Sequence, residues 1–278
     1  MDVEQQLTWE KRRAPAAAAC ATISALLSLA AFLYFGVAVE GEISNDSQTV
    51  LAYDEQSNLF ITTSILRAAA LVLLIPALMY LFKAAKARRP ETPAVGLTLA
   101  VIGPALLAAG GLVSAIDRVN AADGEGKLSE KAAEELLRDL PGWVTGFAFG
   151  GSLAFAIALI IIALSAMRAG LLSRFMGILG IGLGVLTGLS ALGGGVAAPL
   201  LIFYFVALAL LFLGKWPGGR GPAWDSGEAI PWPTQVDRIK AMEEQKAAEG
   251  GDRPPEIESG DPDTPQTASR TKRKRKRR

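Results

Sequence analysis

Long apolar segments alternate with short polar ones along this chain. Six apolar segments reach or approach the roughly 20 residues that a helix needs to cross a bilayer core. They cover residues 14–39, 59–82, 93–116, 144–167, 175–192 and 196–213. Because backbone groups in hydrocarbon must find hydrogen bonds within their own segment, each of these is expected to be a helix. The pattern predicts an all-α fold, a polytopic membrane bundle of six transmembrane helices with a disordered cytoplasmic C-terminal tail.

Lys and Arg residues gather at every second junction between these segments. The clusters are Lys11, Arg12 and Arg13; Lys83, Lys86, Arg88 and Arg89; Arg168 and Arg174; and Lys215 and Arg220. Basic junctions favour the cytoplasmic side, so both termini are predicted to be cytoplasmic. The junction at 117–143 also carries Arg118, Lys127, Lys131 and Arg138. It weakens the assignment, but an odd number of spans would contradict more junctions than it rescued.

The first apolar segment could instead be a signal peptide. Its apolar stretch is longer than the usual region of about 7–15 residues, and no Ala-x-Ala cleavage site follows it. The Ala17-Ala18-Ala19-Cys20 string faintly resembles a lipoprotein cleavage box, but few apolar residues separate Cys20 from the basic cluster. An uncleaved membrane anchor is the favoured interpretation.

Composition divides the chain into four parts. We expect a cytoplasmic N-terminus at 1–13, the transmembrane domain at 14–215, a Trp- and Pro-rich cytoplasmic segment with a short helix at 216–250, and a disordered tail with a basic terminus at 251–278. Periodicity and capping residues also predict helices outside the apolar segments. The second helix is expected to begin outside its apolar segment and to cover about 47–58 as well, with Asp46 or Ser47 as its cap. Short helices are expected at 130–140 and 235–249.

The residue content disfavours enzymatic and metal chemistry. The chain has no His and a single Cys, so the commonest general base and transition-metal ligand is missing, and no thiolate cluster can form. No catalytic, metal or cofactor site is predicted. The apolar segments at 14–39, 144–167, 175–192 and 196–213 have no charged residue in their cores, which is poor provision for a proton or sodium relay.

Arg67 is the charged residue that a membrane segment holds most deeply. If the second helix enters the bilayer at Leu59, the Arg67 guanidinium lies about 12 Å below the outer surface and needs an acidic partner. Asp117 or Asp54 could supply it. If the embedded part starts near Leu66, Arg67 instead extends to the headgroups. Arg67 and Asp117 are the candidate intramembrane polar site.

Glycines recur at helical spacing in two segments, where they would let a neighbouring backbone approach closely. Packing is favoured over a pore lining because no polar side chain accompanies them. The glycines expected at helix contacts are Gly146, Gly150, Gly177, Gly180, Gly184 and Gly188.

Aromatic and basic residues after the sixth segment indicate contact with a lipid surface. Trp216 fits an interface anchor, whereas Trp224 and Trp232 need either a groove on the bundle or the headgroup layer. The last seven residues are all basic, as in segments that bind anionic lipid; a protein partner or a solvated tail is the alternative, and no specific nucleic acid is expected. The basic run is Lys272, Arg273, Lys274, Arg275, Lys276, Arg277 and Arg278.

Several strings together resemble uncharacterised multi-pass integral membrane proteins of high-GC bacteria, a family of unknown function. They are LRA at 66–68, YLFKA at 80–84, RRP at 88–90, RFMGILG at 174–180 and AWDSGEAIPW at 223–232. The resemblance spans most of residues 14–234. It implies six helices in the bacterial inner membrane and no established activity.

Three functions are compatible with these observations. The leading hypothesis is a structural or interaction module without enzymatic activity, which uses its tail to contact anionic lipid headgroups, a protein partner or a second copy of the chain. The alternative is a small-solute transporter or channel with Arg67 near its outer mouth. A membrane enzyme comes third, because His is missing and no acidic clusters lie at the cytoplasmic junctions.

Overall fold

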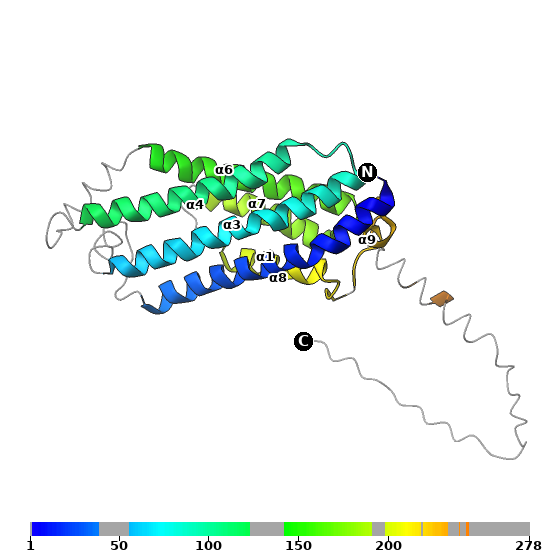
Figure 1. Ribbon diagram of the computed structural model, residues 1–278, viewed down its shortest axis with the longest axis horizontal. Helices are drawn as coiled ribbons and strands as arrows, with labels where there is room; N and C mark the ends of the chain where they lie inside the picture. The colour runs from blue at the N-terminus through cyan, green and yellow to red at the C-terminus, as the bar shows by residue number, and fades with distance from the viewer. Residues whose placement is uncertain are drawn as a thin grey trace, which may run out of the picture. The chain divides into compact units, whose positions relative to one another are not determined.

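The computed structural model describes residues 2–38, 56–122, 142–190, 198–217 and 219–232, together with the single positions 239, 243 and 244. This part of the chain is all-α and contains no strand (Figure 1). The helices are α1 (Val3–Ala38), α3 (Ser57–Arg88), α4 (Val95–Ala122), α6 (Gly142–Arg168), α7 (Arg174–Ser190), α8 (Ala198–Phe212) and the single turn α9 (Ala223–Ser226).

Four helices are long and apolar enough to cross a membrane: α1, α3, α4 and α6. The fifth and sixth predicted spans correspond to α7 and α8, which are apolar but contain 17 and 15 residues. At 1.5 Å per residue these two helices are about 26 and 23 Å long, against a hydrocarbon core of about 30 Å. Residues 191–197, which connect them, lie outside the described residues.

Helices α1 and α3 extend well beyond their apolar parts. The first apolar segment was expected from Ala14, yet α1 begins at Val3, and α3 continues past Phe82 to Arg88. Hydropathy marks the part of a helix that suits lipid, whereas Glu, Gln, Lys, Arg and Ala favour helix in water as well. The extensions are neighbours, because α1 and α3 are antiparallel and Tyr80 of α3 contacts Glu10 of α1.

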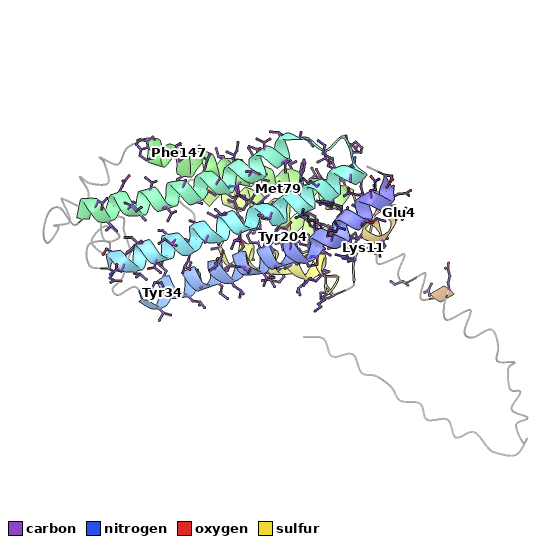
Figure 2. The ribbon with its side chains drawn as sticks, in the orientation of Figure 1. Glu4, Lys11, Tyr34, Met79, Phe147 and Tyr204 are labelled. Carbon is purple, nitrogen blue, oxygen red and sulfur yellow. The ribbon has the colours of Figure 1, made fainter. Side chains whose placement is uncertain are left out.

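We call the end of the bundle that holds these extensions the basic end, after Lys11–Arg13 of α1 and the stretch Lys83–Arg89 at the end of α3. In Figure 2, Glu4 and Lys11 lie at this end of α1 and Tyr34 at the other. The junctions 89–94, 169–173 and 213–217 connect helices at the same end. Junctions rich in Lys and Arg therefore share one end, as the sequence pattern predicts.

The helices pack in a closed order. Helix α1 lies between α3 and α8, α4 lies between α3 and α6, and α7 packs on α6 and contacts α8. The largest fully buried side chains include Phe82, Leu159, Leu171, Tyr204 and Phe212. Large apolar side chains on the outer faces stay exposed, among them Phe32, Val72, Ile102, Ile157 and Phe203. An exposed apolar surface spread over every long helix suits a lipid surrounding.

The chain divides into two compact units, Met1–Trp232 and Pro233–Arg278. The Trp- and Pro-rich stretch up to Trp232 lies in the first unit, together with the helices. Within that stretch, residues Ala223–Ser226 form α9. The predicted helix at 130–140 lies outside the described residues, as do most of those at 47–58 and 235–249 and the whole basic run at 272–278.

Candidate functional site at the basic end of the bundle

A buried ion pair joins α1 to the end of α3. Arg88 Nη1 lies 2.5 Å from Glu10 Oε1, and Arg88 Nη2 lies 3.0 Å from Glu10 Oε2. The Arg88 side chain is 0% exposed and that of Glu10 is 3% exposed. Gln6 adds a hydrogen bond from its amide Nε2 to Glu10 Oε1, at 2.8 Å. The paired charges are thus removed from water in a bidentate arrangement.

Every N–H of the Arg88 guanidinium has an acceptor. An arginine side chain carries five such donors. Besides the two bonds to Glu10, Nη1 donates to the Ala84 carbonyl at 3.0 Å, and Nε and Nη2 donate to the Ala223 carbonyl at 2.9 and 2.8 Å. A buried charge is tolerated when its hydrogen bonds are satisfied in this way. Arg88 therefore connects three segments: α1, α3 and α9.

Trp224 fastens α9 to the bundle. Its indole Nε1 donates a hydrogen bond to the Leu171 carbonyl at 2.9 Å, and the residue is 3% exposed. The Trp224 ring stacks on Tyr80 with centroids 5.9 Å apart and meets Phe212 edge-on at 6.2 Å. Of the two surroundings that the sequence allowed for Trp224, the structure shows the groove on the bundle. Its predicted role as a lipid-surface residue is corrected, because protein atoms cover the ring.

Two arginines lie over the Trp224 ring. The Arg88 guanidinium is 5.6 Å and that of Arg220 is 5.3 Å from the ring centroid. Arg220 also donates hydrogen bonds to the Leu211 and Phe212 carbonyls at the end of α8. The last carbonyls of a helix lack partners within it and carry partial negative charge, so a cation there is stabilising. Arg220 thereby caps α8 and packs on the Trp224 ring.

Glycines allow the segment after α8 to approach the bundle. Gly170 has φ +76°, and a Cβ there would lie 1.8 Å from the Ile230 carbonyl oxygen. At Gly221 a Cβ would lie 2.3 Å from Nε1 of Trp232. Larger residues at either position would separate the segment from the junction between α6 and α7. Trp232 is partly buried against the core, and its Nε1 is buried without a hydrogen-bond partner.

Tyr80 lies at the centre of an aromatic cluster. Its ring stacks on Trp9 at 5.6 Å and meets Phe212 edge-on at 4.9 Å, in addition to its contact with Trp224. Its hydroxyl donates to the Glu10 backbone carbonyl at 3.3 Å. We use the term latch for this ensemble, which consists of Glu10, Tyr80, Arg88, Ala223 and Trp224. The latch holds α1, α3, α8 and α9 together at the basic end.

The side chains of the latch join helices to one another. The Glu10 carboxylate and the Arg88 guanidinium bind each other and connect α1 to α3. The described residues include no group of three or more His, Cys, Asp or Glu placed to hold a metal ion.

The candidate polar site lies toward the opposite end of the bundle. Arg67 of α3 is exposed, and its guanidinium lies 5.8 Å from the centroid of the Phe35 ring of α1. Asp117 of α4 is half-buried. One contact of Arg67 is thus with an aromatic ring on the neighbouring helix, which suits an exposed arginine.

Three of the predicted packing glycines of α7 lie in close contacts. A Cβ at Gly180 would come within 2.4 Å of the Tyr204 hydroxyl, one at Gly184 within 2.6 Å of Ile160, and one at Gly177 within 2.5 Å of Met167. At Gly188 the nearest atom would be 3.5 Å away, an ordinary contact.

The predicted glycines of α6 differ. A Cβ at Gly146 or Gly150 meets no atom of the described residues within 4 Å, whereas one at Gly151 would lie 2.9 Å from the Leu107 nitrogen. A Cβ at Gly103 would lie 2.5 Å from the Phe155 nitrogen. Gly151 and Gly103 therefore make the α4–α6 contact, and the expectation for Gly146 and Gly150 is corrected. Spacing identified a glycine pattern in α6 but not the face that α4 covers.

Sequence reasoning counted Arg88 only as a topology signal and gave Glu10 no role. One signal pointed to the latch. The strings YLFKA, RRP and AWDSGEAIPW, which carried the family resemblance, contribute Tyr80, Arg88, Ala223 and Trp224, and these residues meet in space. Trp216 is partly buried against the core.

Comparison with protein families gives one match. A domain of unknown function, DUF4386, matches residues 20–217, which include Tyr80 and Arg88 of the latch but not Glu10, Ala223 or Trp224. No curated protein and no solved structure matches the chain. Because the match covers most of its length, this chain belongs to the DUF4386 family.

Proposed function

We propose that this chain is a six-helix protein of the bacterial inner membrane, with both termini in the cytoplasm, that acts as a structural or interaction module without enzymatic activity. In this proposal α7 and α8 complete the six spans as a hairpin, and the basic end faces the cytoplasm. The C-terminal tail then contacts anionic lipid headgroups or a protein partner.

The latch is the observation that carries this proposal. It fixes the chain up to Trp232 on the helices. If the basic end faces the cytoplasm, as proposed, the tail then begins close to the membrane surface. The charged residues buried at this end, Glu10 and Arg88, are used to hold that position. A rigid attachment of this kind suits a module that presents a binding segment.

The seven basic residues at the end of the tail favour anionic lipid as the contact. Each Lys or Arg close to an anionic surface contributes about 1 kcal/mol at moderate ionic strength. The tail is joined to a membrane protein, so its local concentration at the surface is high.

Fluorescence of the full-length protein in lipid nanodiscs tests this contact. A dye is attached to Ser269→Cys in a Cys20→Ala background, and quenching by a lipid-borne quencher is compared between phosphatidylglycerol and phosphatidylcholine discs. We expect stronger quenching with phosphatidylglycerol, and its loss at high salt or on deletion of Lys272–Arg278. Equal quenching in both lipids would contradict lipid binding and leave a protein partner as the ligand of the tail.

The alternative of a transporter or channel depends on Arg67. If Arg67 binds a small solute near the outer mouth of a transport pathway, Arg67→Gln should abolish uptake of that solute into proteoliposomes. The thermal stability of the protein should stay unchanged. The position of Arg67 beside Phe35 on the neighbouring helix favours a packing role instead.

A further inference from the structure

A groove runs between α1 and α3 on the side of the bundle that carries Trp9. It has a volume of about 280 Å³ and opens to the outside. At the basic end of the bundle the groove adjoins a wider hollow of about 500 Å³, which shares Trp9 and Lys83 with it. The residues of the narrow groove are Trp9, Arg13, Ala16, Ala17, Cys20, Pro76, Met79, Tyr80 and Lys83.

The groove is cationic at one end and apolar at the other. On α1, Arg13 precedes Cys20 by two helical turns; on the antiparallel α3, Lys83 follows Pro76 by the same distance. Seven residues of helix correspond to about 10 Å. Both cations therefore lie at the basic end, and both helices lead from them toward the apolar middle of the bundle.

Small side chains leave the space that forms the narrow groove. Ala16 and Ala17 leave space beside α3, and Met79 and Pro76 form the opposite wall. At the top, the Lys83 ammonium lies 5.9 Å from the centroid of the Trp9 ring. The tryptophan and the two cations thus lie at the basic end of the groove, and its apolar part leads away from them. This order matches a membrane interface, where headgroups lie above hydrocarbon.

The charges around the groove sum to a positive surface. Arg13 and Lys83 line the groove itself, and Lys86 and Asp2 line the adjoining hollow. Glu4 and Arg12 line a further hollow that shares Trp9 and Arg13 with the groove, so cations still outnumber carboxylates. Glu10, which follows Trp9 on α1, faces away into the latch and is neutralised by Arg88. Two unburied cations at the mouth of the groove thus attract an anion.

We propose that this groove binds one anionic phospholipid of the membrane leaflet at the basic end. Its phosphate lies between Arg13 and Lys83, and one acyl chain follows Ala16, Cys20 and Met79 toward the bilayer centre. An acyl chain gains little by exchanging lipid for an apolar protein wall. The preference must therefore come from the headgroup, and it selects a net negative lipid over a zwitterionic one.

This inference requires that the helices cross a bilayer, as proposed above, but it is independent of the tail. The groove and the basic run at 272–278 can be tested separately, since either can be removed while the other stays intact.

Cys20 provides a native probe, because it is the single cysteine of the chain and lines the apolar part of the groove. The experiment measures the rate at which N-ethylmaleimide alkylates Cys20 in delipidated full-length protein in detergent, titrated with phosphatidylglycerol or phosphatidylcholine. We expect phosphatidylglycerol to slow alkylation at a concentration at least tenfold lower than phosphatidylcholine does.

Three variants separate the groove from other effects. Arg13→Gln with Lys83→Gln should remove the preference for phosphatidylglycerol over phosphatidylcholine, because each cation lost lowers the affinity for the anionic lipid about fivefold. Lys11→Gln with Lys215→Gln makes the same change of charge at exposed positions outside the groove and should keep it. Ala16→Phe, at an exposed position on the groove wall, should fill the groove and so abolish the lipid-dependent protection of Cys20.

Two further arms identify the source of the anion and the part of the chain involved. Glycerol phosphate, which has the headgroup chemistry without acyl chains, should not protect Cys20. Deletion of residues 272–278 should leave the protection unchanged. Equal protection by the two lipids, or a preference that survives Arg13→Gln with Lys83→Gln in folded protein, would overturn the proposal.

Discussion

The Arg88 guanidinium and the Glu10 carboxylate form a bidentate buried ion pair although 78 residues separate them in the chain. The pair ties the first helix to the end of the second long helix, and the remaining donors of Arg88 hold the carbonyl of Ala223. One side chain thus joins α1, the end of α3 and α9, which lie far apart in the sequence.

Removal of one member of this pair should destabilise the protein strongly. Glu10→Leu leaves a buried guanidinium without its counter-ion, which costs about 3–5 kcal/mol. Arg88→Met leaves the Glu10 carboxylate buried and alone, with a similar loss. The double variant should lose less than the sum of the two, because no unpaired charge remains. Denaturant unfolding in detergent measures the three values.

The neighbouring ion pair is a matched control. Arg89 and Glu91 pair at 2.5 Å, but their side chains are 32% and 63% exposed. Exposed pairs contribute about 0–1 kcal/mol, so Arg89→Met should change the free energy of unfolding by less than 1 kcal/mol on the same scale. If Arg89→Met and Arg88→Met proved equally mild, the latch would not be the structural element described here.

Trp224 is predicted to fasten the last turn through both its ring and its N–H. Trp224→Phe keeps an aromatic ring but loses the hydrogen bond to the Leu171 carbonyl, at a cost of about 1–3 kcal/mol because a buried acceptor is left unsatisfied. Trp224→Ala also creates a cavity and should cost about 3–5 kcal/mol. Trp143→Ala, at a residue that is 51% exposed, should cost much less.

Limited proteolysis gives the local readout for Trp224. Cleavage between residues 219 and 232 should accelerate in the order wild type, Trp224→Phe, Trp224→Ala, since opening of the segment exposes its backbone. Identical cleavage rates in all three proteins would mean that the segment is held by other contacts.

Glycines of α7 offer a comparison within one helix. A Cβ at Gly184 would lie 2.6 Å from Ile160 and 2.8 Å from the Ala156 carbonyl oxygen, so Gly184→Ala must displace a backbone atom. Overpacking of this kind costs about 1–3 kcal/mol. A Cβ at Gly182 meets nothing described within 4 Å, so Gly182→Ala should be neutral or slightly stabilising. Thermal unfolding in detergent distinguishes the two, and an equal effect would contradict the α6–α7 contact.

The helices could be predicted because hydrophobicity acts locally. Each apolar segment favours a helix by itself, and the structure shows a helix in each of the six, four of them long and apolar enough to cross a membrane. The latch could not be predicted in the same way. Glu10 and Trp224 lie outside the apolar segments, and their pairing with Arg88 and Tyr80 depends on which helices become neighbours. The same limit explains why the sequence predicts Gly146 at a helix contact where the structure places Gly151, since spacing within a helix does not reveal which face a partner covers.

The central claim, a six-span protein with both termini in the cytoplasm, is tested most directly by cysteine labelling in intact cells with a membrane-impermeant reagent. In a Cys20→Ala background, the account predicts that Ser47→Cys and Gly194→Cys are labelled from outside, whereas Ser269→Cys is labelled only after lysis. Labelling of Ser269→Cys from outside would invert the orientation, and protection of Gly194→Cys with labelling of Ser47→Cys would show that α7 and α8 do not cross the membrane.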